Sequence, residues 1–141
     1  MNRAYLQTRI LMLAFIFNLI WENLQAPLYG DAYVQFPRHY MMCFWAALGD
    51  VVFVMTLYLI VAWTRKDWLW FQEIRIRDVG IVILFGGAGA IIVEKVALGL
   101  FFWHYTSVMP IIPWFDVGLV PILQMLILPL LTFYVATNIR K

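Results

Sequence analysis

The residues with the most evident chemistry lie in a hydrophobic stretch near the N-terminus. Asn18, Glu22 and Gln25 are spaced i, i+4 and i+7, so a helix places all three on one face. An ionisable side chain at membrane depth costs about 3 kcal/mol on insertion scales, and it usually faces a protein interior or a wet cavity. Glu22 therefore predicts polar partners elsewhere in the chain.

The composition predicts an integral membrane protein. Of the 141 residues, 65% are hydrophobic and 13% are charged, whereas about 25% are charged in soluble domains. Segments at about 9-29, 40-64, 78-103 and 117-137 are each near the roughly 20 residues that span a bilayer. We expect an all-α fold, a polytopic four-transmembrane-helix bundle that forms a single transmembrane domain over residues 1-141.

The positive charges predict the orientation. Arg3 and Arg9 also resemble the start of a signal peptide, but Asn18 and Glu22 interrupt its apolar run and Pro27 follows the only suitable cleavage site, so we expect a retained helix. The positive-inside rule then places both termini in the cytoplasm, in the cytoplasmic (inner) membrane of a bacterium. The residues on the expected inner side are Arg3, Arg9, Arg65, Lys66, Arg75, Arg77, Arg140 and Lys141, and Arg38 lies on the outer side.

The segment 65-77 between the second and third helices mixes aromatic residues with charges. Trp68, Trp70 and Phe71 lie among its Arg, Lys and acidic residues. We expect this segment to lie in the headgroup plane, as amphipathic interfacial segments do.

Polar residues recur at one depth in all four helices. Counted at 1.5 Å per residue from the expected outer boundary, Asp50, Glu94 and Gln124 lie roughly 9 to 15 Å deep, at the level of Asn18 and Glu22. Asp50 and Glu94 share helix faces with small residues, which mark close helix contacts. The glycine-rich third segment, Gly86 to Ala90, predicts such a contact too. The sequence therefore predicts one intramembrane cluster near the outer leaflet.

Three chemical interpretations of this cluster stay open. Acids held together at low dielectric share protons, which suits a proton donor, a proton-coupled carrier or a purely structural hydrogen-bond network. For an enzyme, Glu22 or Glu94 is the expected proton donor and Asp50 its partner. The catalytic candidates are thus Glu22, Asp50 and Glu94, and the ligand-binding candidates are Asn18, Trp21, Gln25, Trp103 and Gln124. Trp21 and Trp103 would face a cationic intermediate.

This layout resembles that of membrane-embedded isoprenoid cyclases and sterol isomerases. The resemblance rests on Trp21-Glu22, Asp50 and Glu94. It implies a buried acid that protonates an alkene, and it transfers no site residue.

Other kinds of site have weaker signals. His39 and His104 lack a compact ligand spacing, so we expect no metal, and no cofactor or nucleic-acid motif is present in the sequence. Cys43 is expected to pack as a small apolar residue. The segment 103-118 is either a re-entrant lid or a plain connection, and Lys95 is expected to serve structure or a subunit contact.

The function that we expect is binding of an apolar or amphipathic small molecule, isoprenoid- or lipid-like, in an acid-lined cavity, with or without proton transfer. The alternatives are a small accessory subunit of a larger membrane complex and a proton-coupled transporter. The expected partners are membrane lipid, the small molecule, and a homo-oligomer or larger complex. Enzyme activity stays open.

Overall fold

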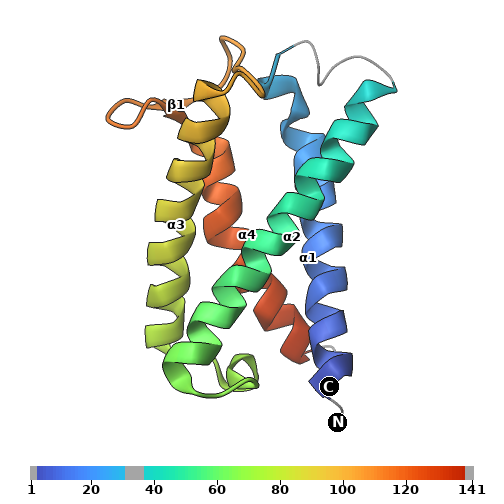
Figure 1. Ribbon diagram of the computed structural model, residues 1–141, viewed down its shortest axis with the longest axis vertical. Coiled ribbons are helices and arrows are strands. Elements are labelled where there is room, and N and C mark those ends of the chain that lie inside the picture. The colour runs from blue at the N-terminus through green and yellow to red at the C-terminus, as the bar shows by residue number, and fades with distance from the viewer. Residues whose placement is uncertain (1–2, 31–36, 139–141) are drawn as a thin grey trace.

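The computed structural model describes residues 3–30 and 37–138, and its long elements are helices (Figure 1). They are α1 (Arg3–Gln25), α2 (Arg38–Arg65), α3 (Ile76–Gly99) and α4 (Leu119–Asn138). Short elements join them: 3-10 turns η1 (Ala26–Leu28) and η3 (Trp70–Glu73), and strands β1 (Ile111–Ile112) and β2 (Val117–Gly118). The strands pair antiparallel, with Ile111 opposite Gly118.

Within the described residues, four helices are long and apolar enough to cross a membrane. This confirms the predicted all-α class and the presence of four helices of spanning length. We call the end where α1 ends and α2 begins the outer end, after the orientation expected from the sequence, and the opposite end the inner end. The start of α1 and the end of α4 meet at the inner end, where the Arg9 guanidinium donates to the Ala136 carbonyl at 2.9 Å.

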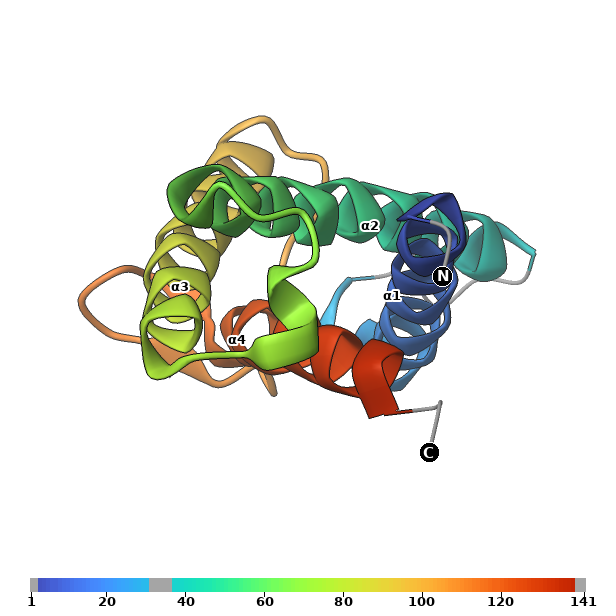
Figure 2. The same ribbon diagram turned by 90° about the horizontal axis from the view of Figure 1, so that it is seen from below.

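The helices do not pack equally along their lengths. α1 packs against α2 and α4, and α3 packs mainly against α4. At Gly86 of α3, an added Cβ would lie 2.8 Å from the Met125 carbonyl oxygen of α4, so the two backbones approach closely as the glycine-rich sequence predicts. The end of α2 and the start of α3 lie side by side at the inner end, and the two helices diverge toward the outer end (Figures 1 and 2).

The segment between α2 and α3 turns into the core of the bundle. Trp68 is half exposed, but Trp70 and Phe71 are buried, at 1% and 0% exposure. They pack with Tyr58 and Phe133 in the core. The chain turns back between the helix ends here (Figure 2), so the rings of Trp70 and Phe71 contact the core of the bundle, and the depth of the segment in the membrane stays a prediction.

Hydrogen bonds hold this segment in place. The Trp70 indole donates to the Tyr58 carbonyl at 3.2 Å, and the Tyr58 hydroxyl donates to the Trp68 carbonyl at 2.7 Å. Arg65, at the end of α2, forms a 2.8 Å ion pair with buried Asp78 at the start of α3. The inner end of the bundle is therefore filled and fixed.

Two helices end earlier than predicted. Pro27 lies in η1, since a proline cannot donate to the α1 ladder, and α1 stops at Gln25. α3 stops at Gly99 and not near residue 103: Phe101 adopts a left-handed conformation (φ 57°), and Phe102 N–H donates to the Ala97 carbonyl at 2.9 Å. This is a Schellman-type helix end, and it turns the chain back over the bundle.

The outer connection 100–118 is tied to the end of α1. Gly30 N–H donates to the His104 carbonyl at 2.9 Å, and Thr106 N–H donates to the Leu28 carbonyl at 3.0 Å. A bridge between Tyr29 and Tyr105 lies between these bonds. These hydrogen bonds hold the outer connection against the end of α1. Residues 31–36 of the other outer loop lie outside the described residues.

Candidate functional site

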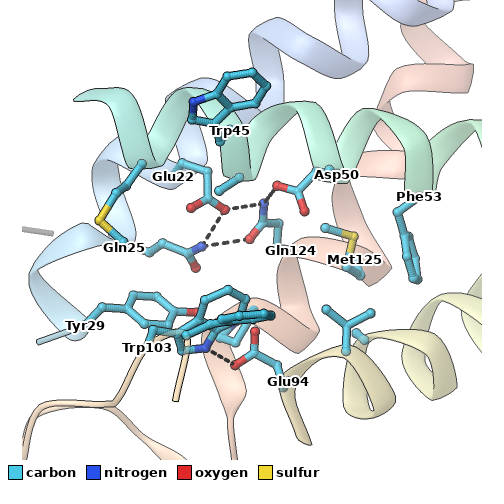
Figure 3. Close-up of a pocket in the computed structure, with 17 residues that line it drawn as sticks. Glu22, Gln25, Tyr29, Trp45, Asp50, Phe53, Glu94, Trp103, Gln124 and Met125 are labelled. Atoms are coloured by element: carbon cyan, nitrogen blue, oxygen red, sulfur yellow. Dashed lines mark hydrogen bonds between the residues drawn. The ribbon is translucent and has the colours of Figure 1, made fainter. Parts of the chain in front are cut away.

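A cavity of about 580 Å³ lies in the outer half of the bundle (Figure 3). All four helices and the outer connection contribute to its wall, which is mainly aromatic and aliphatic. Such a volume suits a drug-sized or lipid-like ligand. Five polar side chains line it: Glu22, Gln25, Asp50, Glu94 and Gln124.

Gln124 of α4 is the centre of a hydrogen-bond network on one wall. Its side-chain nitrogen donates to Asn18 Oδ1 at 3.0 Å, Glu22 Oε1 at 3.0 Å and Asp50 Oδ2 at 2.8 Å. Its side-chain oxygen accepts from Gln25 Nε2 at 2.9 Å. Residues from α1, α2 and α4 therefore meet at one amide, at the common depth that the sequence suggests.

The two acids of this wall share one hydrogen-bond donor. Gln25 Nε2 donates to Glu22 Oε1 at 2.8 Å, and the Gln124 side-chain nitrogen donates to the carboxyl groups of both Glu22 and Asp50. Glu22 is 5% exposed. Because two neighbouring carboxyl groups in a buried site cannot both ionise without a large cost, this geometry suits a pair that holds a single proton.

Asn18 and Trp21 stand behind this wall and do not line the cavity in the described part of the chain. Asn18 is fully buried and donates to the Ala14 carbonyl at 2.8 Å. The Trp21 indole donates to Gln25 Oε1 at 3.1 Å. In the described structure these two side chains hold Gln124 and Gln25 in position, and their contact with a ligand stays a prediction.

Glu94 lies across the cavity from the Gln124 network (Figure 3). Its Oε2 accepts from the Trp103 indole at 3.4 Å and from the Tyr105 hydroxyl, which itself accepts from Gly118 N–H at 2.9 Å. Burial, and then the neighbouring Glu94, raises the pKa of Tyr105 above its ordinary value, so Tyr105 remains a donor. The five predicted polar residues thus form two groups and not one cluster.

The cavity opens through the side of the bundle between α2 and α3. Trp45 of α2 and Phe102 after α3 both line it, yet each is 64% exposed on the outer surface. Gly49 of α2 is also exposed, and nothing lies within 4 Å of the position of a Cβ there. In a bundle that spans the bilayer, such an opening between two helices faces lipid.

The remaining candidates lie away from the cavity. Lys95 is exposed on the surface of α3 and forms no ion pair within the described residues. His39 contacts Asn23 and Cys43, and His104 packs against Gly30. Across residues 3–30 and 37–138, no group of three His, Cys, Asp or Glu side chains is placed to hold a metal ion.

Sequence reasoning did not find Tyr105 or Trp45 as site residues. Tyr105 lies in an irregular connection, where no periodicity indicates direction. Trp45 lies one position from the small-residue face of Ala46 and Ala47 and could be taken for a lipid anchor.

Comparisons of the chain with protein-family models, with curated proteins and with solved structures gave no significant match.

Proposed function

We propose that the protein binds an apolar or amphipathic small molecule, isoprenoid- or lipid-like, in this cavity and exchanges a proton with it. The observation that supports this most strongly is an apolar cavity with hydrogen-bonded acids on two of its walls. The apolar wall favours a hydrophobic ligand. The acids favour proton transfer, because a membrane protein carries buried carboxyl groups at a cost.

The residues have separate roles in this proposal. Glu22 is the proton donor, and Asp50 is the partner that retains or returns the proton. Glu94 is a second acid, held by Trp103 on the opposite wall. Gln25 and Gln124 keep the carboxyl groups oriented, so the pair is preorganised before a ligand arrives.

The mouth supplies a route for the ligand. Since Trp45 and Phe102 are exposed where the bundle faces the membrane, a lipid-soluble molecule enters from the bilayer without crossing an aqueous phase. This favours lipid or isoprenoid classes over water-soluble metabolites.

The filled inner end argues against the transporter alternative. A proton-coupled carrier needs access from both sides, and here Tyr58, Trp70 and Phe71 occupy the inner half of the bundle. The structure offers a single-sided pocket.

The accessory-subunit alternative is favoured by one observation. Lys95 is exposed near the outer end of a spanning helix, where an acid of a neighbouring subunit could pair with it. Native mass measurement after gentle extraction distinguishes an accessory subunit from a protein that acts alone. A defined hetero-complex supports the subunit hypothesis, and a monomer or homo-oligomer contradicts it.

Orientation is part of the proposal. The positive residues concentrate at the inner end, so we propose a bacterial cytoplasmic membrane with both termini in the cytoplasm. A C-terminal green fluorescent protein fusion is expected to fluoresce and an alkaline phosphatase fusion to be inactive; the reverse result contradicts the orientation.

Occupancy of the cavity tests the binding proposal. Gly49→Leu projects a side chain into the mouth, and Gly80→Leu is the matched control, because Gly80 also lies in a helix with nothing within 4 Å of its Cβ position. Native mass spectrometry of protein purified from its membrane is expected to show a bound small molecule in the wild type and in Gly80→Leu. In Gly49→Leu, the fraction of protein that carries the bound molecule should be at least about tenfold lower. Equal occupancy in the two variants contradicts the proposal.

Proton transfer has its own test. Glu22→Gln keeps the shape of the side chain and removes its titration. Binding or turnover of the co-purified molecule is expected to vary with pH in the wild type and to lose that variation in Glu22→Gln. If the pH profile is unchanged, Glu22 has no proton role.

A further inference from the structure

The cavity has acids on two walls and no basic group on any described one. Its acidic lining residues are Glu22, Asp50 and Glu94, and among the described residues no Lys, Arg or His lines it. Lys95 follows Glu94 but is rotated by about 100° around α3 and is exposed on the outside of the bundle. The described wall of the cavity therefore offers a ligand three carboxyl groups and no positive charge.

One carboxylate oxygen is not used by the protein. Both donors to Glu94 reach Oε2, and within the described residues no hydrogen bond reaches Oε1. Glu94 is 5% exposed, and its second oxygen is directed into the cavity (Figure 3). A carboxylate oxygen that faces an apolar cavity without a donor from the described protein residues favours a ligand that brings a donor, or that brings positive charge.

The aromatic residues add to the same preference. Trp103 and Tyr29 meet edge to face, with ring centroids 6.1 Å apart, on the wall beside Glu94. Trp45 and Phe102 flank the mouth. Ammonium groups are attracted to aromatic faces, most strongly where water is excluded.

We propose that the ligand is an amphiphile with an amine head, which the cavity binds in its protonated, positively charged form. This rests on the proposed function and names its substrate class. The head lies between the Glu22–Asp50 pair and Glu94, against Trp103, and the apolar tail leaves through the mouth between Trp45 and Phe102. An anionic head would meet three acids, and a neutral head would leave the charge of Glu94 unmatched.

The experiment compares three probes of equal chain length: decyltrimethylammonium, decan-1-ol and decanoate. Each is titrated into wild-type protein in nanodiscs of zwitterionic lipid, with empty nanodiscs subtracted, and binding is measured by calorimetry and by quenching of tryptophan fluorescence. The ammonium probe is expected to bind about tenfold or more tightly than the alcohol, and decanoate most weakly. The permanent charge of the quaternary head excludes an effect of probe titration.

Variants locate the preference. Glu94→Gln should reduce the preference for the ammonium probe over the alcohol, taken as the ratio of their dissociation constants, about tenfold. Glu73→Gln is the control, because its side chain is exposed at the inner end and should leave both affinities unchanged. Glu22→Gln is the second test variant and decides the question if Glu94→Gln does not fold.

The outcomes separate this inference from the proposed function. Equal binding of the ammonium and the alcohol by the wild type, with Gly49→Leu weakening both, overturns the positive head and leaves the cavity as a binding site. A preference that persists in both Glu94→Gln and Glu22→Gln also overturns it. Binding that is unaffected by Gly49→Leu relative to Gly80→Leu overturns the binding site and this inference together.

Discussion

Replacing Gln124 by methionine tests whether the polar network holds the bundle together. Gln124 is 1% exposed and is joined to residues of α1 and α2. Methionine has nearly the same length and no hydrogen-bonding amide, so Gln124→Met removes the bonds with little change in packing.

The expected loss follows from the bonds. The amide nitrogen carries two hydrogens, so its three acceptors share two bonds at a time, and Gln25 supplies a third bond to the oxygen. At about 0.6 kcal/mol each in membrane proteins, these contribute about 2 kcal/mol. Glu22 and Asp50 also lose a donor while buried, which raises the expected loss of unfolding free energy to about 2 to 4 kcal/mol.

The assay is reversible unfolding in mixed micelles, followed by circular dichroism as the fraction of denaturing detergent rises. Leu123→Met is the control, because Leu123 is the neighbouring position on the exposed side of α4, and it should change the free energy by about 0.5 kcal/mol or less. A loss for Gln124→Met no larger than that of the control refutes the network.

A double-mutant cycle makes the reasoning stricter. Glu22→Gln and Gln124→Met together should be less destabilising than the sum of the single changes, with a coupling of about 0.5 to 3 kcal/mol, because both remove the same bonds. Additive losses would mean that the two side chains do not interact.

Three further predictions concern other parts of the bundle. Trp70→Ala should lower the free energy of unfolding by about 3 to 5 kcal/mol in the same assay, because it leaves a cavity where a buried ring lay. Trp68 is half exposed, so Trp68→Ala should lower it far less. Similar losses for the two variants would contradict the filled inner end. Gly86→Ala should lower the free energy of unfolding by about 1 to 3 kcal/mol, because the added methyl group would clash with the backbone of α4. Gly80 has open space around it, so Gly80→Ala should be neutral or stabilising. Equal effects of the two variants would contradict the close approach of α3 and α4. Burial raises the pKa of Tyr105, so the unfolded chain ionises this hydroxyl at a lower pH than the folded protein does. The contribution of Tyr105 to the free energy of unfolding is therefore complete below about pH 10 and falls as the pH rises further. Tyr105→Phe should flatten this part of the stability profile, and an identical profile in wild type and variant would contradict the shift.

Sequence reasoning succeeded where depth and helical direction decide position. The rise per residue is constant in a helix, so Asn18, Glu22, Asp50 and Gln124 could be assigned a common depth before any packing was known. The small residues beside Asp50 indicated which face meets other helices. The approach of these four side chains in space follows from those two regularities.

It failed where the chain is irregular. Phe101 is a left-handed residue without being glycine, so nothing in the sequence predicted that α3 would end at Gly99 and release Trp103 and Tyr105 toward Glu94. Trp70 and Phe71 lie in a segment whose composition is typical of the membrane interface. Composition alone does not distinguish an aromatic ring among lipid headgroups from one that packs between helix ends.

The closed inner end and the open side together restrict how the proposed chemistry can proceed. A ligand must enter and leave by the same mouth between α2 and α3, because Trp70 and Phe71 fill the opposite end. A proton that the Glu22–Asp50 pair gives to the ligand must then be replaced from the outer side, and Glu94 is the third acid on the described cavity wall. Glu94 therefore has two distinct uses in the proposal, as the counter-charge of the bound head and as the relay for the proton. Glu94→Gln separates them: loss of the ammonium preference with turnover retained supports the first, and loss of turnover with binding of the neutral probe retained supports the second.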